Sequence, residues 1–327
     1  MSSGRESIFE ERKKLVKKVL ERVKDTLDLS NKNYAIIQFP TRYKERSIDI
    51  VAIDEQGQNI VLRVKPTLSI SRDEVDDLIK ASLALNAVPL MVTEDESLFD
   101  NIVYEREGIY ILNERTLENM CLRPSELIAL YRKGDLYVTL DSKAFKRLKS
   151  LRSFSLGDIA YRTGISRRTL YEYEREGGMV SIDLAERLVE VLGEDVVKTI
   201  SLKTIRKEFI KKVSRVESKD LSKLRREKIV SLISNKKVKA VFDLKRSAPD
   251  YIVRNEERRI DIVVDATSKR YTLKEMVKKV TESIKVSNLV GGVTNLIVNR
   301  DKGLTLIDEL STQISINKLD IIKINDK

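Results

Sequence analysis

Residues 155–174 read SLGDIAYRTGISRRTLYEYE, and their apolar spacing predicts two short helices joined by a glycine turn. Ser155 is a favourable N-cap for the first helix, and Gly164 supplies the positive φ with which a helix ends at little cost. Ser166 caps a second helix, residues 166–175, whose outward side is polar. This pattern is typical of a helix-turn-helix, in which the second helix enters the major groove of DNA.

Amphipathic helices flank this pair. Ala144, Leu148 and Leu151 form the apolar stripe of a basic upstream helix, and a downstream helix runs from Ser181 to Gly193. An ordinary helical bundle is the alternative interpretation. The stretch resembles the DNA-binding domain of the Cro and lambda-repressor type, also called the XRE type. The residues that carry this resemblance are Leu156, Ala160, Gly164, Ile165, Ser166, Tyr173, Glu174, Leu192 and Gly193.

The candidate DNA contacts lie on the two central helices. Arg167 and Arg168 are placed for bidentate contacts to guanine, and Thr169 for a thymine methyl group or a phosphate. Ser155 and Ser166, at helix starts, are placed to hold phosphates. Two further candidates face backbone, a neighbouring base or solvent, and these are Arg162 and Tyr171.

The composition favours a polyanionic partner but does not establish one. The net charge is +11 and the pI about 9.4. Abundant Lys and Glu without Trp are also typical of a thermophile's surface. The absence of histidine and the single cysteine, Cys121, exclude His-based triads, zinc ribbons and an internal disulfide. No apolar run is long enough for a membrane span, so we expect a cytoplasmic protein.

Residues 1–122 alternate helices and strands in an α/β order. The expected elements are a helix over 6–28, strands over 34–39, 47–53 and 59–65 with a turn at Gln56-Gly57, a helix over 71–86, strands over 88–93 and 108–112, and a helix over 117–120. The helix over 71–86 is expected to be capped by Ser71 with Glu74 three residues on. This order resembles the PD-(D/E)XK fold of restriction enzymes and Holliday junction resolvases. In that family an Asp and an acidic-x-Lys motif hold a metal ion and activate water. Asp49 and Lys65 match, but Arg63 stands at the acidic position, so we expect no metal, cofactor or catalytic residue.

Residues 219–327 contain a second copy of the same pattern at an offset of about 200. The matched pairs are Asp250 with Asp49, Asp265 with Lys65, Glu275 with Glu74, 293–298 with 88–93, and Lys302-Gly303-Leu304 with Glu107-Gly108-Ile109. Val263 and Asp265 then occupy the positions of the acidic residue and the lysine, so this copy also departs from the motif. The alternative is a weak metal site at Asp250 and Asp265, with Asp261 nearby.

Two linkers join these parts. Residues 123–140 are expected to hold a short helix over 124–131 and a strand over 137–140. Residues 198–218 are strongly basic and are either an arm along DNA phosphates or a solvated linker. Their basic side chains are Lys203, Arg206, Lys207, Lys211, Lys212 and Arg215.

The expected fold class is α/β plus all-α, with two restriction-endonuclease-like domains flanking a lambda-repressor-like bundle at 141–197. The arrangement resembles predicted archaeal HTH-type transcriptional regulators. It implies a regulator that binds double-stranded DNA and is not an enzyme. Because one such bundle reads few base pairs, we expect a homodimer through the α/β domains. The alternatives are a metal-dependent nuclease or junction-processing enzyme, and a scaffold that contacts the basal transcription machinery.

Overall fold

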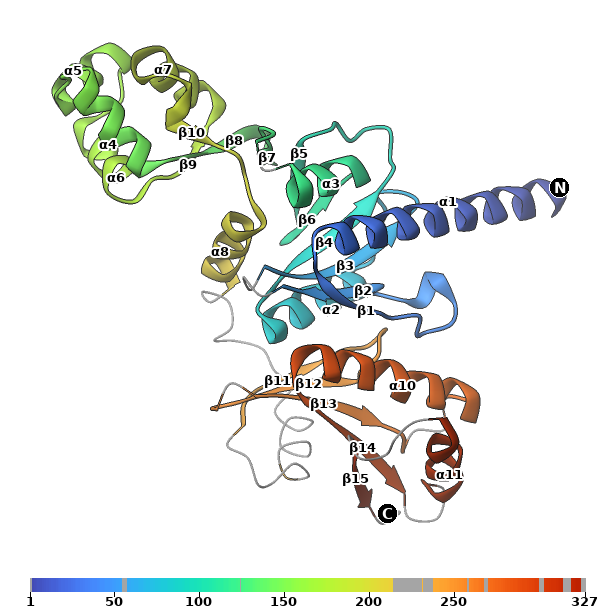
Figure 1. Ribbon diagram of the computed structural model, residues 1–327. Coiled ribbons are helices and arrows are strands. Elements are labelled where there is room, and N and C mark those ends of the chain that lie inside the picture. The colour runs from blue at the N-terminus through green and yellow to red at the C-terminus, as the bar shows by residue number, and fades with distance from the viewer. Residues whose placement is uncertain are drawn as a thin grey trace.

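Figure 1 shows the computed structural model, which describes residues 2–54, 58–123, 125–213, 231, 238–257, 259–267, 270–299, 303–313 and 319–324, with side chains from residue 10 onward. The turn expected at Gln56-Gly57 and the last residues of the basic linker, 214–218 with Arg215, lie outside this range. Three parts follow one another: a first α/β unit (2–122), a four-helix unit (142–192) and a second α/β unit (238–324). No helix in the described part of the chain is long and apolar enough to cross a membrane.

The first α/β unit follows the expected order. Its elements are α1 (Ser2–Leu29), β1 (Asn33–Ile36), a 3-10 turn (Tyr43–Glu45), β2 (Ile50–Ile53), β3 (Asn59–Lys65), α2 (Arg72–Leu85), β4 (Ala87–Thr93), β5 (Ile102–Arg106), β6 (Ile109–Leu112) and α3 (Glu114–Leu122). β1, β2 and β3 are antiparallel neighbours, and β3, β4 and β6 are parallel. The expected capping box of α2, between Ser71 and Glu74, is present. β5 was not expected from the sequence.

A hairpin leads from this sheet to the four-helix unit. It consists of β7 (Ala129–Arg132) and β8 (Asp135–Leu140), and β7 continues the sheet by pairing with β5. The short helix expected over 124–131 is therefore wrong, because this segment buries alternate residues as a strand does. Lys133 and Gly134 both have positive φ, 55° and 96°, as a two-residue hairpin turn requires.

The four-helix unit has its own apolar core. Its helices are α4 (Ser142–Leu151), α5 (Leu156–Thr163), α6 (Arg167–Glu176) and α7 (Ile182–Leu192), and two short strands, β9 (Gly178–Ser181) and β10 (Val197–Lys198), pair with β8 beside the 3-10 turn Glu194–Val196. The fully buried members of the core are Phe145, Ile159, Leu170, Leu188, Leu192 and Val196. The unit is thus attached through β8 and is packed around separate side chains.

The second α/β unit repeats the strand order and directions of the first. After α8 (Leu202–Val213) come β11 (Val238–Asp243), β12 (Tyr251–Asn255), β13 (Ile260–Asp265), α10 (Leu273–Val290), β14 (Val293–Asn299), α11 (Gly303–Gln313) and β15 (Leu319–Ile324). The strands lie in the order β11-β12-β13-β14-β15, with β13, β14 and β15 parallel. β15 therefore takes the place of β6.

Two details of the expected repeat are corrected. The Val64 amide donates to Asp49 Oδ2 at 2.8 Å, and the Asp265 amide donates to Asp250 Oδ2 at 2.9 Å, so Asp265 corresponds to Val64 and not to Lys65. The counterparts of Arg63 and Lys65, one residue on either side, are thus Val264 and Ala266. Lys302 lies outside the described residues, and Gly303 and Leu304 begin α11, where a strand start was expected.

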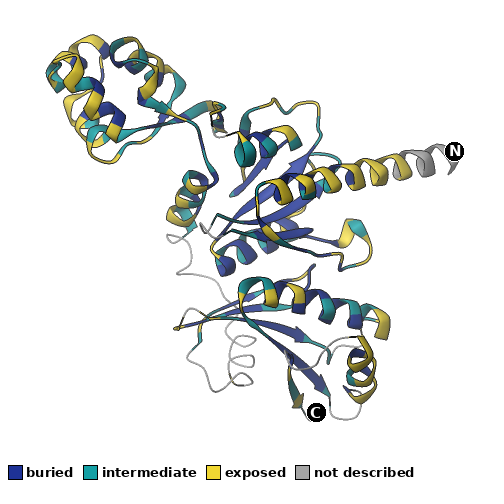
Figure 2. Ribbon diagram, viewed as in Figure 1, coloured by how far each residue is buried: buried dark blue, intermediate teal, exposed yellow. Residues whose placement is uncertain are grey.

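The two α/β units pack against each other reciprocally. α2 lies on β11 and β12, α10 lies on β1 and β2, and the side chains between them form one apolar core. Asp77 of α2 accepts hydrogen bonds from two consecutive amides of the second unit, at 2.9 and 2.8 Å. Glu282 of α10 accepts from the amides of Gln38 and Phe39, both at 2.8 Å. Figure 2 shows that the strands of both sheets are mostly buried.

Candidate nucleic-acid interface

The turn between α5 and α6 is held by local hydrogen bonds. Ser155 Oγ accepts from the Asp158 amide at 3.1 Å, and the Asp158 carboxylate accepts from the Ser155 amide at 2.8 Å. The Ser155 hydroxyl also donates to Asp158 Oδ2 at 2.6 Å, and the hydrogen bonds that this hydroxyl and the Ser155 amide donate hold the pKa of Asp158 below its ordinary value. Gly164 ends α5 at φ 69°, as expected, and Ser166 Oγ accepts from the Thr169 amide at 3.1 Å to start α6. Only three residues therefore separate the two helices.

The two arginines of the first turn of α6 lie on the surface. The Arg168 side chain is 91% exposed, and its Nε lies 3.6 Å from a carboxylate oxygen of Glu172, one turn further along. Arg167 extends across to the start of α5, because a Cβ added at Gly157 would lie 2.7 Å from Arg167 Nη2. Arg167 thus bridges the first turns of both helices.

The opposite side of α6 fixes the helix in its unit. Leu170 is fully buried, and Tyr173 packs against the same core. Glu174 forms an ion pair with Lys149 of α4 at 2.5 Å. These contacts indicate a structural role for Tyr173 and Glu174. α6 is therefore anchored on one side and presents arginines on the other.

The seven candidate contact residues all lie on α5, α6 and their caps. Six are exposed and Thr169 is half-buried, and the exposed ones are Ser155, Arg162, Ser166, Arg167, Arg168 and Tyr171. The guanidinium of Arg162 lies over the ring of Phe154, 4.8 Å from its centroid. Tyr161 was missed, although it is 92% exposed in the last turn of α5. A tyrosine between Ala160 and Arg162, off the apolar stripe, was the available sequence signal.

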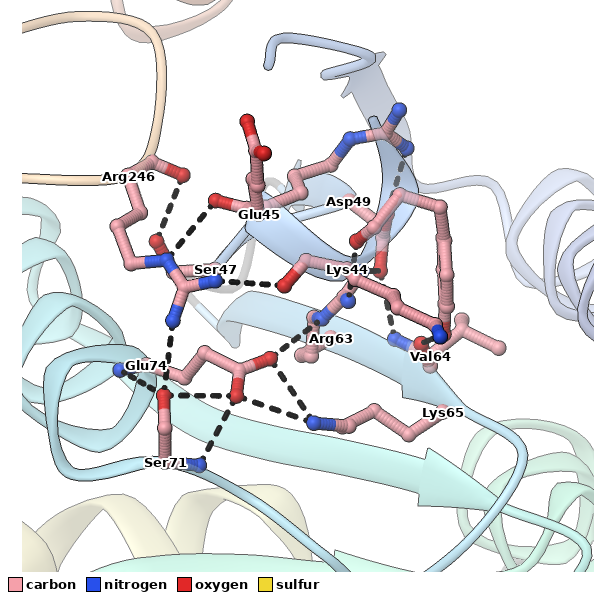
Figure 3. A network of polar contacts seen from close by, with 12 residues as sticks. Lys44, Glu45, Ser47, Asp49, Arg63, Val64, Lys65, Ser71, Glu74 and Arg246 are labelled. Carbon is pink, nitrogen blue, oxygen red and sulfur yellow. Dashed lines mark hydrogen bonds and ion pairs between the residues drawn. The ribbon is translucent and has the colours of Figure 1, made fainter. Parts of the chain in front are cut away.

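A second polar cluster occupies the nuclease-like position of the first α/β unit (Figure 3). Arg63 lies between two acidic side chains, with Nη1 2.7 Å from Asp49 Oδ2 and Nε 3.4 Å from Glu74 Oε1. Lys65 Nζ lies 3.0 Å from the same Glu74 carboxylate. Arg63, Asp49 and Glu74 are 0%, 1% and 3% exposed. The guanidinium therefore occupies the position between two carboxylates that would otherwise be available to a metal ion.

The second α/β unit closes this cluster. Arg246 donates from Nη1 to Ser71 Oγ at 3.0 Å, and its carbonyl accepts from the Ser47 amide at 2.9 Å. Burial alone would raise the pKa of Glu74, but hydrogen bonds from Ser71 and Lys65 outweigh it and hold that pKa below its ordinary value. Burial lowers the pKa of Lys65. No group of three or more acidic, Cys or His side chains in the described ranges is arranged to hold a metal.

The corresponding position of the second unit is more open. Asp250 pairs with Lys279, whose ammonium lies 4.9 Å from the Tyr271 ring centroid and 5.1 Å from that of Phe39. Burial raises the pKa of Asp250. Asp250 faces a cavity of about 900 Å³ between the two α/β units. Each copy therefore pairs the aspartate directly before its second strand with an internal cation, which comes from β3 in the first copy and from α10 in the second.

One similarity to known proteins covers the first α/β unit, and another covers most of the chain. Residues 16–126 match a PD-(D/E)XK superfamily domain. Over 313 residues the chain is 28% identical to a "Putative HTH-type transcriptional regulatory protein" of Sulfolobus acidocaldarius, covering 93% of this chain and 97% of that protein. Proteins of the same name from Sulfurisphaera tokodaii and Aeropyrum pernix are each 28% identical, covering 83% and 82% of this chain and 89% and 81% of their own lengths. No solved structure matches the chain significantly.

Proposed function

We propose that this protein is a transcriptional regulator that recognises specific sequences in double-stranded DNA through α6. The observation that carries the proposal is the pair α5–α6, in which Arg167 and Arg168 are exposed at the start of a helix that is anchored from behind. The names of the archaeal relatives support the same function, since those proteins are similar to this chain over nearly its whole length.

The proposed binding mode is that of an XRE-type helix-turn-helix. The first turn of α6 enters the major groove, where Arg167 and Arg168 contact guanine edges, each contributing about 1 to 3 kcal/mol of discrimination. Ser155 and Ser166, at the starts of α5 and α6, bind flanking phosphates. The half-buried Thr169 lies beside them for a thymine methyl group or a phosphate. The expected partner is therefore duplex DNA with a guanine-containing site.

We further propose that the regulator acts as a homodimer on two half-sites. The faces of α2 and α10 are occupied by contacts within one chain, so a second chain attaches elsewhere on the α/β units. A docking role for these units toward the transcription machinery is the alternative use of the same surface. Light scattering measures the oligomeric state with and without a duplex that contains the recognised sequence. Monomers alone in both conditions would contradict the dimer.

We propose that neither α/β unit cleaves DNA. Arg63 occupies the position between both carboxylates of the first copy, and Val264 and Ala266 stand where the second copy would need the charged motif residues. The nuclease interpretation rests on the superfamily match to residues 16–126. Supercoiled, branched and single-stranded DNA incubated with Mg²⁺ or Mn²⁺ tests it. Cleavage that Asp49→Ala or Asp250→Ala abolishes would overturn our proposal.

The deciding experiment is selection of bound sequences from random duplex DNA, repeated with Arg167→Ala and Arg168→Ala. We expect each variant to lose base preference at its own position while residual salt-sensitive binding remains. Arg175→Ala is the matched control, because Arg175 is exposed on the same helix but lies in its last turn. An unchanged motif in the first two variants would remove the proposed recognition role.

A further inference from the structure

The positive charge of this chain is not located in the four-helix unit. Residues 141–197 contain ten Lys and Arg and ten Asp and Glu, so their net charge is zero. Residues 198–237 contain fourteen Lys and Arg against four Asp and Glu, which accounts for +10 of the chain's +11. Because DNA affinity depends strongly on phosphate neutralisation, a neutral recognition unit needs cations from another part of the chain.

The described part of this basic segment is the helix α8, which is firmly held. Its apolar side, Leu202, Ile205 and Phe209, is buried in the core of the first α/β unit. Lys212 binds both carboxylate oxygens of Glu105 of β5, at 2.5 and 2.6 Å. α8 is therefore a fixed surface element and not a freely moving tether.

α8 is also joined closely to the four-helix unit. It starts four residues after β10, and the intervening Ile200 donates its amide to the carbonyl of Ile128 at 2.9 Å. The Ile128 amide in turn donates to Thr199 Oγ1 at 2.9 Å. Figure 1 shows α8 at the junction between the four-helix unit and the first α/β unit. The strands that attach the four-helix unit, β8 and β10, therefore also determine where α8 lies relative to the recognition helix α6.

The outward side of α8 carries a row of lysines. Lys203, Lys207 and Lys211 are exposed and lie four residues apart, opposite the buried residues of the helix. At a rise of 1.5 Å per residue, successive lysines are about 6 Å apart along the helix axis. Flexible ammonium groups at this separation suit neighbouring phosphates of a nucleic-acid strand. The single acidic residue of α8, Glu208, lies off this row and faces Arg132.

We propose that α8 is a second, sequence-independent DNA contact, in which Lys203 and Lys207 bind backbone phosphates beside the site read by α6. This inference rests on the proposed function, because it takes duplex DNA as the partner. It divides the two tasks of binding between two elements. α6 supplies base discrimination from a neutral unit, and α8 supplies the salt-dependent part of the affinity.

The test measures the affinity of the full chain for a mixed-sequence duplex and for the selected duplex by fluorescence anisotropy over a range of salt concentrations. We expect Lys203→Gln/Lys207→Gln to weaken both affinities by the same factor, on the order of tenfold or more at about 0.1 M salt. The slope of log K against log salt should become shallower by about 2, while the ratio of the two affinities stays constant. Lys203→Arg/Lys207→Arg should retain the original slope.

The matched control is Lys14→Gln/Lys18→Gln, which removes two exposed lysines at the same four-residue spacing from α1. We expect no change in slope from this pair. An unchanged slope in the α8 variant, or an equal change in the α1 variant, would overturn the inference. Failure of the proposed function has a different signature, because it would remove the preference of the unmodified protein for the selected duplex.

Discussion

Arg63 illustrates how one residue determines the chemistry of a site. Its guanidinium is fully buried, contacts Asp49 and Glu74, and lies 4.3 Å from the centroid of the Tyr43 ring. Removing a charge from such a cluster leaves the remaining charges uncompensated in a medium that solvates them poorly. The residue is therefore expected to contribute to folding.

Arg63→Ala should lower the free energy of unfolding by about 3 to 5 kcal/mol, because Asp49 and Glu74 lose the buried cation that they share and keep only Arg46 and Lys65. Denaturant titration followed by circular dichroism measures this. Arg42→Ala is the control, since the Arg42–Glu45 pair is 84% and 52% exposed and should contribute less than about 1 kcal/mol. Equal effects of the two substitutions would contradict a structural role for Arg63.

Glu282 predicts a pH dependence of stability at the contact between the α/β units. Burial raises its pKa in spite of the hydrogen bonds from Gln38 and Phe39. A raised folded-state pKa favours the folded state at low pH. The stability of the unmodified protein relative to Glu282→Gln should therefore be greatest below the ordinary carboxyl pKa of about 4.3 and should fall as the pH rises through the higher folded-state pKa.

Glu275 on the same helix supplies a control of opposite sign. Hydrogen bonds from the Thr272 amide and hydroxyl lower its pKa. The stability relative to Glu275→Gln should thus be present above the ordinary pKa and should be lost as the pH falls through the lowered value. Unfolding curves of the three proteins across the acidic range check both statements. Parallel pH trends in the two variants would show that the assigned causes are wrong.

At the scale of elements, the start of α5 supports the start of α6. Gly157→Ala should leave stability unchanged or raise it by up to about 1 kcal/mol, because alanine favours a helix interior. The added methyl group would occupy the space of the Arg167 guanidinium, which must move. We expect specific DNA binding to weaken several-fold without loss of folding, as measured by anisotropy and thermal melting. Unaltered binding would indicate that the position of Arg167 is not critical.

Local sequence signals predicted several elements closely. Ser71 with Glu74 and Ser155 alone were the N-cap signals in the sequence, and they mark the starts of α2 and α5; Asp158, which completes the capping box of α5, was not singled out. The hairpin at Lys133-Gly134 was not predicted, because its first turn residue is a lysine, which rarely adopts a positive φ and is therefore no sequence signal for such a turn. The one-residue error at Asp265 arose because alignment alone does not determine strand register, which depends on inter-strand hydrogen bonds.

At the scale of the whole molecule, the described core residues divide into a cluster within the four-helix unit and clusters that build the α/β units. Leu188→Ala should destabilise the four-helix unit by about 2 to 5 kcal/mol, while Ile252→Ala should affect both α/β units, because Ile252 belongs to their shared core. Hydrogen exchange with peptide resolution measures this. Faster exchange throughout the chain in Leu188→Ala would contradict separate cores.

The contact between the α/β units was not predictable from periodicity. Asp77 and Glu282 resemble exposed helix residues in the sequence. In the structure each is buried between the units and accepts hydrogen bonds from two backbone amides of the other unit. Such contacts join residues some 170 or 240 positions apart. The candidate DNA-binding residues were easier to locate, because all seven lie within a single short segment whose structure is local.

The reciprocal packing of the two α/β units within one polypeptide makes their association a unimolecular event. Dilution cannot separate them, and the linking chain keeps their effective concentration high even where the contact itself is polar. Because the two copies differ in sequence, their contact need not be symmetric. Asp49 can therefore be buried beside Arg63 while Asp250 faces an open cavity. The pair of α/β units therefore has two unlike sides, whereas a dimer of two identical units would have two equal ones.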